Sequence, residues 1–127
     1  MQYEDKDYLV EEYDLEPDSW EELEREDKTA FLAAIVRQDE TEKASQASLD
    51  ELERLANTAG IEVLGRYTQK RNNPERASYF GKGFLEEISH RMHQAQADLL
   101  IVNEELNPIQ QRNIEQNFSI RVIDRTE

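Results

Sequence analysis

The side chains best suited to bind a ligand are four basic residues within residues 69–82, a stretch that holds a single acid, Glu75. They are Lys70, Arg71, Arg76 and Lys82. Lysine and arginine bind phosphate groups, and Tyr79 and Phe80 of the same stretch could stack on nucleic-acid bases. Because the rest of the chain is strongly acidic, an anionic partner is expected to bind here. The alternative is a solvated loop whose aromatic residues pack on the following helix.

A second candidate is the glycine pair Gly81 and Gly83, which flanks Lys82 at the expected start of a helix. Free backbone N–H groups at a helix N-terminus attract anions, and glycines let a phosphate approach the backbone. A tight turn would also explain the two glycines. A nucleotide-binding P-loop is excluded, because Gly60 and Gly65 are followed by Arg66-Tyr67 instead of Lys and Ser or Thr.

Other reactive residue types form no convincing site. His90 and His93 lie three residues apart on an expected helix surface, but the chain has no cysteine and no further histidine to complete a metal site. Acidic residues lie near expected strand ends without converging: Asp98, Glu104, Glu105 and Asp124. The sequence therefore predicts neither a metal site nor a catalytic centre.

The elements that position these residues alternate between strand and helix. Apolar runs predict strands over residues 30–36, 61–68, 98–102 and 119–124. Helices are predicted from the capping box that starts at Ser48 to the residue before Gly60, from Gly83 to Ala95, and from the Asn107-Pro108 pair to Phe118. The βαβαβαβ pattern predicts a single α/β domain with a four-stranded parallel sheet, flanking helices and strand order 2-1-3-4.

The charge is concentrated at one end of the 127-residue chain, whose net charge is −14. Residues 1–28 hold 13 acids and 3 bases, a net of −10, and few apolar residues. This composition predicts a flexible acidic segment ahead of a folded domain at 29–127. The alternative is a short docking helix that starts at the capping box Ser19–Glu22 and carries Trp20 and Leu23. Without an apolar run long enough for a membrane span or a signal peptide, a cytoplasmic protein is expected.

A set of motifs in residues 29–127 resembles the N-terminal domain of the HflX family of GTPases. The resemblance is carried by Ala59-Gly60, Gly65, Gln69, Arg71, Pro74, Tyr79–Gly83, Glu86–Ile88, Asp98–Val102, Glu105–Pro108, Gln110–Asn113 and Val122–Glu127. One position departs from the pattern: Phe84 stands where many members of the family carry Lys after the second glycine.

The resemblance implies a module that associates with the large ribosomal subunit and contacts its RNA, in a protein that splits stalled ribosomes under stress. It also implies that GTP and Mg²⁺ are bound by a separate downstream GTPase domain, so no catalysis, cofactor or metal is expected in this chain. The residues expected to contact RNA or phosphate are Gln69, Lys70, Arg71, Arg76, Tyr79, Gly81, Lys82, Gly83 and Arg112, with Tyr79 either stacking on a base or supporting the loop. Arg125 is expected to orient the next domain.

Two other functions stay open at this stage. The module could bind a nucleotide such as ATP, with its phosphates at Gly81-Lys82-Gly83. It could also act as an interaction domain that only positions its own GTPase domain.

Overall fold

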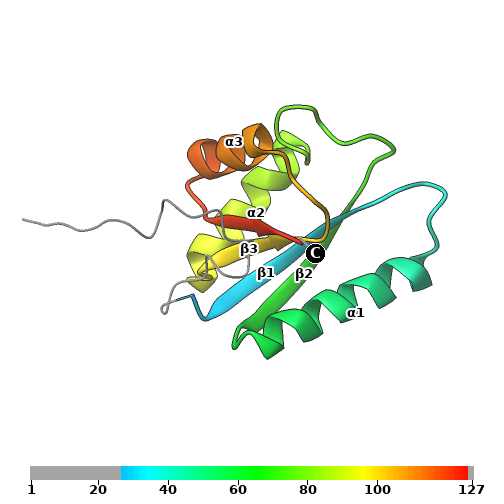
Figure 1. Ribbon diagram of the computed structural model, residues 1–127. Coiled ribbons are helices and arrows are strands. Elements are labelled where there is room, and N and C mark those ends of the chain that lie inside the picture. Colours follow the sequence, from blue (N-terminus) through cyan, green and yellow to red (C-terminus); the bar gives the residue numbers. More distant parts are fainter. Residues whose placement is uncertain (1–26, 126–127) are drawn as a thin grey trace, which may run out of the picture.

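Four parallel strands form one sheet, as predicted, with the order β2-β1-β3-β4. A computed structural model describes residues 27–125. Its elements are β1 (Thr29–Val36), α1 (Glu42–Thr58), β2 (Glu62–Lys70), α2 (Lys82–Ala95), β3 (Leu99–Val102), α3 (Pro108–Phe118) and β4 (Val122–Asp124). Figure 1 shows that all four strands run in the same direction, so the loops that follow β1, β2 and β3 lie at one edge of the sheet.

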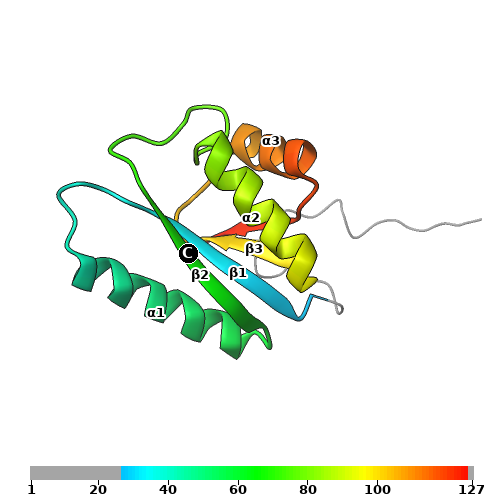
Figure 2. The ribbon, with the colours of Figure 1, turned by 180° about the vertical axis from the view of Figure 1, so that it is seen from behind.

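The helices form two layers around the sheet. Figures 1 and 2 show α1 on one side, and α2 and α3 on the other. The central strand β1 is covered on both faces, which explains its continuous apolar sequence. Phe31, Ala33 and Ile35 belong to the core beside α2 and α3, whereas Ala30, Leu32 and Ala34 belong to the core beside α1.

Local signals mark several of the helix ends. Gly60 adopts a left-handed φ of 85° just after α1, as the sequence predicts. Asn107 and Gln110 form a reciprocal capping box at the start of α3. The predicted start of α1 at Ser48 is wrong, because Thr41 is the N-cap and accepts a hydrogen bond from the Ala44 N–H.

The edge strand β2 contains a bulge that decides where its later side chains point. Ala30 pairs with Val63 but Phe31 pairs with Gly65, so Leu64 is an extra residue in β2. Side chains alternate between the faces of a strand, and an extra residue reverses that alternation. As a result, Gln69 faces the α2 side.

The outcome of this reversal is visible in the contacts of β2. Arg66 contacts Asp50 and Glu53 of α1, whereas Tyr67 packs in the core beside α2. Lys70 therefore shares the α1 side with Arg66, opposite to its neighbour Gln69.

Several element ends differ from the sequence prediction. The last strand begins at Val122 instead of residue 119, because Ser119 has a left-handed φ of 57° and ends α3. Ala95 and Ala59 are exposed, not buried on helix faces. The capping box Ser19–Glu22 and the rest of residues 1–26 lie outside the described residues. Asp27 and Lys28, which the sequence prediction assigned to the acidic segment, are tied to the fold: Asp27 pairs with Arg121, and the Lys28 N–H donates to Asp98.

Candidate functional site

The loop that follows β2 is closed on itself by a reciprocal pair of hydrogen bonds. The Glu75 N–H donates to the Tyr79 carbonyl and the Tyr79 N–H donates to the Glu75 carbonyl, each at 2.9 Å. Tyr79 adopts an unusual φ of 66° in this closure. The loop is therefore a defined turn whose tip carries Arg76.

Helix α3 holds this turn in place through two amide side chains. The Gln110 Nε2 donates to the carbonyls of Glu75 and Arg76, at 3.2 and 3.3 Å, and the Asn113 Nδ2 donates to the Ala77 carbonyl at 2.9 Å. The carbonyls of Arg76 and Ala77 thus accept hydrogen bonds from a neighbouring helix instead of from water. This contact fixes the tip of the loop relative to the sheet.

Tyr79 offers no ring face for stacking on a base. Its side chain is 4% exposed and meets Phe80 edge-on, with ring centroids 4.9 Å apart, and Phe80 is itself fully buried. Burial raises the pKa of the Tyr79 hydroxyl, and the nearby Glu104 carboxylate raises it further. Of the two roles predicted for Tyr79, the structure supports the one inside the loop. Base stacking by Tyr79 or Phe80 is not compatible with this burial.

Gln69, Arg71 and Gly81 form a clamp at the base of the same loop. The Gly81 N–H donates to Gln69 Oε1 at 3.1 Å, and Arg71 pairs with Glu75 at 2.8 Å. The Arg71 Nε also donates to the Asn73 carbonyl. A Cβ on Gly81 would lie 2.8 Å from the Arg71 guanidinium, so glycine is what permits this approach. The hydrogen bonds of the Gln69 and Arg71 side chains therefore hold the loop in its conformation.

The remaining cations around the loop are exposed and have no ion pair or side-chain hydrogen bond within residues 27–125. They are Lys70, Arg76 and Lys82, which we call the basic rim. Lys70 lies on the α1 side of the end of β2, and Lys82 is the first residue of α2. Gly81 is the N-cap of α2 and makes no side-chain cap hydrogen bond, and Gly83 in the first turn is exposed.

Arg112 of α3 is not part of the basic rim. Gln110 and Asn113 face the loop and Ile114 is buried, whereas Arg112 is exposed and falls on the opposite side of the helix by its spacing. Of the predicted residues, the structure thus brings Gln69, Arg71 and Gly81 together as a support and leaves the basic rim exposed around it.

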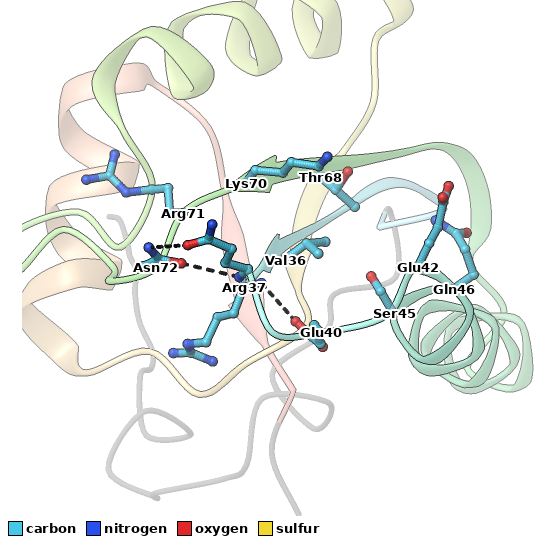
Figure 3. A pocket seen from close by; sticks show the side chains of 11 residues that line it. Val36, Arg37, Glu40, Glu42, Ser45, Gln46, Thr68, Lys70, Arg71 and Asn72 are labelled. Carbon is cyan, nitrogen blue, oxygen red and sulfur yellow. Dashed lines mark hydrogen bonds between the residues drawn. The ribbon is translucent and has the colours of Figure 1, made fainter.

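A groove of about 590 Å³ lies beside the basic rim at the carboxyl ends of β1 and β2. Figure 3 shows it between the end of β2, with Thr68 and Lys70, and the first turns of α1, with Ser45 and Gln46. Arg37 reaches the groove from the end of β1, while the side chain of Arg71 points away from it toward α2. Such edges are where open α/β sheets bind ligands.

A side-chain bridge joins the two loops at the groove. The Asn72 Nδ2 donates to Gln38 Oε1 at 3.1 Å, and Asn72 Oδ1 accepts from the Gln38 N–H at 3.3 Å. Glu40 and Glu42 also line the groove, and Glu40 accepts from the Arg37 N–H. The groove is therefore lined by side chains of both charges.

Asp98 does not converge with the acidic residues that follow β3 and end β4, as predicted. Asp124 accepts from the Leu106 N–H at 2.7 Å at the carboxyl edge, whereas Asp98 lies at the opposite edge. Hydrogen bonds from the backbone of Lys28 and Thr29 lower the pKa of Asp98. Within the described part of the chain, no cluster of acidic and histidine residues could hold a metal ion.

Comparison with known proteins agrees with this architecture. The family described as GTP-binding GTPase N-terminal matches residues 46–127, more than half of the chain. The chain belongs to this family.

Relatives of this GTPase N-terminal domain carry the name GTPase HflX. The HflX of Caldanaerobacter subterraneus subsp. tengcongensis is 44% identical over 109 residues, 86% of this chain and 24% of that protein. The HflX of Alkalihalophilus pseudofirmus is 45% identical over 82 residues, 65% of this chain and 19% of that protein. The HflX of Escherichia coli strain K12 is 34% identical over 86 residues, 68% of this chain and 20% of that protein. The chain thus spans about a quarter or less of these relatives, in their N-terminal portion.

Several of the motif residues that carry the HflX resemblance build the loop after β2. Gln69, Arg71 and Gly81 form its clamp, and Gln110 and Asn113 hold its tip. Sequence reasoning missed Arg37, although it directly follows the apolar run of β1 and so had to lie at the carboxyl edge.

No helix of residues 27–125 has the length and apolar character needed to cross a membrane.

Proposed function

We propose that this chain is the RNA-contacting module of an HflX-type GTPase and that it binds the large ribosomal subunit in the cytoplasm. The observation that carries the proposal is the basic rim. Lys70, Arg76 and Lys82 are exposed around a loop that other residues hold rigid, and none of the three is neutralised by an acid of residues 27–125.

The rigidity of the loop matters because ordering a flexible loop on binding costs conformational entropy. Here the clamp and the α3 amides supply that order before binding. Cations on both sides of the end of β2 can contact successive phosphates of one RNA strand, while the acidic groups of the neighbouring loops limit where the strand can run. Shape and phosphate contacts are the usual basis for recognition of folded RNA.

The proposal is tested by co-sedimentation of the chain with large ribosomal subunits over a series of salt concentrations. Lys70→Ala, Arg76→Ala and Lys82→Ala should each weaken binding and reduce the slope of log affinity against log salt by about 0.7–0.9, because one phosphate contact is lost. Arg54→Ala is the matched control, since Arg54 is an exposed cation in the last turns of α1, away from the loop.

An unchanged affinity and slope for all three variants would place the RNA contact elsewhere. Equal losses for Arg54→Ala would show that net charge alone drives the association.

We further expect the chain to hydrolyse neither GTP nor ATP, because it lacks the P-loop lysine and Ser/Thr that position phosphates and Mg²⁺. Clear turnover by purified protein, lost in Lys82→Ala, would contradict this expectation.

The groove supports a second candidate, nucleotide binding. Its volume of about 590 Å³ is in the range of small-molecule sites. It lies on the α1 side of β2, however, and Gly81, Lys82 and Gly83 do not line it. A rise in melting temperature with ATP or GTP, without retention on ribosomal subunits, would favour this candidate over RNA binding.

The contacts of Arg125 support a third candidate, a domain that only positions its GTPase neighbour. The Arg125 guanidinium donates to Asn103 Oδ1 at 2.7 Å and to Ser48 Oγ at 3.2 Å, and pairs with Glu51 at 2.7 Å. The chain is thereby fixed to α1 just after β4. This candidate predicts binding to neither RNA nor nucleotide.

A further inference from the structure

Tyr79 has a backbone conformation that is unfavourable for its residue type. Within residues 27–125, three residues other than glycine have a positive φ: Tyr79, Gln96 and Ser119. Gln96 and Ser119 are the C-caps of α2 and α3, where a left-handed residue commonly ends a helix. Tyr79 instead lies inside the loop after β2, at a φ of 66°, where a bulky side chain is strained. The loop therefore stores backbone strain at Tyr79.

The hydroxyl group of Tyr79 is also left without a hydrogen bond. Tyr79 Oη is buried and has no hydrogen-bond partner in the part of the chain that the structure describes. The charged groups of Arg37, Glu40 and Glu104, which follow β1 and β3, act on the hydroxyl electrostatically but do not hydrogen-bond to it. A hydroxyl that gives up water and gains no partner costs free energy. The loop conformation thus carries a second cost at the same residue.

Tyr79 is nevertheless the anchor of the loop in the core. It is the one buried residue among residues 71–79, and its ring meets Phe80 edge-on. The Arg71–Glu75 ion pair is exposed and contributes only modestly to stability. The reciprocal hydrogen bonds between Glu75 and Tyr79 depend on the position of Tyr79 itself. The position of a single side chain therefore determines whether the loop is attached to the core.

We propose that Tyr79 is the latch of a loop that has two states. In the closed state, which the structure shows, the Tyr79 ring lies in the core and the tip of the loop lies against α3. In the open state the ring turns out to solvent, which relieves the backbone strain and hydrates the hydroxyl. The motion stops at Phe80, because that side chain is fully buried and directly precedes the clamp residue Gly81.

The latch controls the basic rim, and this part of the inference rests on the proposed function. Arg76 lies at the tip of the loop, whereas Lys70 and Lys82 belong to β2 and α2 on either side of it. Only the closed state holds the three cations in one fixed arrangement. RNA that contacts all three therefore binds the closed state, and binding shifts the loop toward closure.

Amide hydrogen exchange tests the latch in the absence of RNA. The N–H groups of residues 75 and 79 are hydrogen-bonded in the closed loop, and local opening should make them exchange faster than the Leu100 N–H in the sheet. Tyr79→Phe removes the unsatisfied hydroxyl and keeps the ring, so exchange at both positions should slow by about tenfold. Tyr67→Phe is the matched control, because the Tyr67 side chain is half-buried and lies outside the loop, and it should leave both rates unchanged.

Two exchange results would overturn the proposal. The first is unchanged or faster exchange at residues 75 and 79 in Tyr79→Phe. The second is exchange at these positions no faster than at Leu100 in the unmodified chain, because the loop would then open only when the whole domain unfolds.

Binding to large ribosomal subunits tests the coupling between closure and the basic rim. Tyr79→Ser removes the anchor, so the affinity should fall several-fold with an unchanged salt slope, because the closed population changes and the phosphate contacts do not. Tyr79→Phe should bind at least as tightly as the unmodified chain. Weaker binding by Tyr79→Phe, or unaffected binding by Tyr79→Ser, would overturn the coupling. If the unmodified chain does not bind subunits, the proposed function fails, whereas the exchange rates still decide whether the latch exists.

Discussion

At the scale of single residues, Gly65 shows how one absent side chain organises the edge strand. A Cβ at this position would lie 2.9 Å from the ring of Tyr67, which packs against Phe31 with centroids 5.0 Å apart. The ring also faces the Arg91 guanidinium at 5.8 Å. Glycine in β2 therefore allows the aromatic side chain to lie flat along its own strand.

Gly65→Ala should lower the free energy of unfolding by about 1–2 kcal/mol, because the Tyr67 ring must leave these contacts. Gly83→Ala is the control, since nothing lies within 4 Å of its added Cβ, and it should be neutral or stabilising by up to about 1 kcal/mol. Denaturant unfolding measures both. If Tyr67→Ala does not reduce the cost of Gly65→Ala, the packing explanation is wrong.

Asp98 links the start of β1 to the start of β3 and makes stability depend on pH. Its carboxylate accepts from the N–H groups of Lys28 and Thr29 and from the Thr29 hydroxyl, and its pKa is lowered from an ordinary value of 3.8. A lowered pKa stabilises the fold above the ordinary value, and this contribution is lost as the pH falls from about 4 through the lower pKa of the folded state.

Asp98→Asn should cost about 1–2 kcal/mol at neutral pH, a value reduced for the partial exposure of the group. The difference from the unmodified chain should shrink below about pH 4. Glu62→Gln at the same edge, where the exposed side chain has no partner in the described region, should cost far less. A difference that stays constant from neutral to acidic pH would contradict the assignment.

At the scale of elements, α3 acts as a scaffold for the loop after β2. Asn113→Ala removes the hydrogen bond to the Ala77 carbonyl without changing charge. Amide hydrogen exchange within the loop 71–81 should become faster, and binding to ribosomal subunits should weaken with an unchanged salt slope, because order and not charge is lost. Asn117→Ala, an identical change at an exposed site of α3, should affect neither. A changed salt slope in Asn113→Ala would count against the scaffold role.

At the scale of the whole molecule, we expect the acidic residues of the N-terminal segment to repel RNA electrostatically over a distance. Residues 1–18 hold eight acids and one base. Their removal should strengthen binding to ribosomal subunits, and most at low salt, where electrostatic screening is weakest. The melting temperature should not change, because the acidic composition of residues 1–18 predicts a segment outside the folded domain. An equal gain at all salt concentrations would indicate a direct contact of the segment with the binding site.

The sequence by itself determined the architecture of this domain. Apolar runs at residues 30–36 and 98–102 had to become buried strands, and the alternation with helices forced a parallel sheet. Gly60 and the Asn107-Pro108 pair mark helix ends through backbone conformation that depends on neighbouring residues only. These features were predictable because their causes are local.

Tertiary structure decided what the candidate site residues do. Ser48 matches a capping box but lies inside α1, where it contacts Arg125, 77 residues away. The bulge at Leu64 sends Gln69 and Lys70 to opposite faces, and packing beneath the loop buries Tyr79. Basic residues that look equivalent in sequence thus divide into a clamp and an exposed rim. Arg71 pairs with Glu75 in a loop conformation that hydrogen bonds from α3 hold in place, whereas the residues of the basic rim have no acidic partner in the described region.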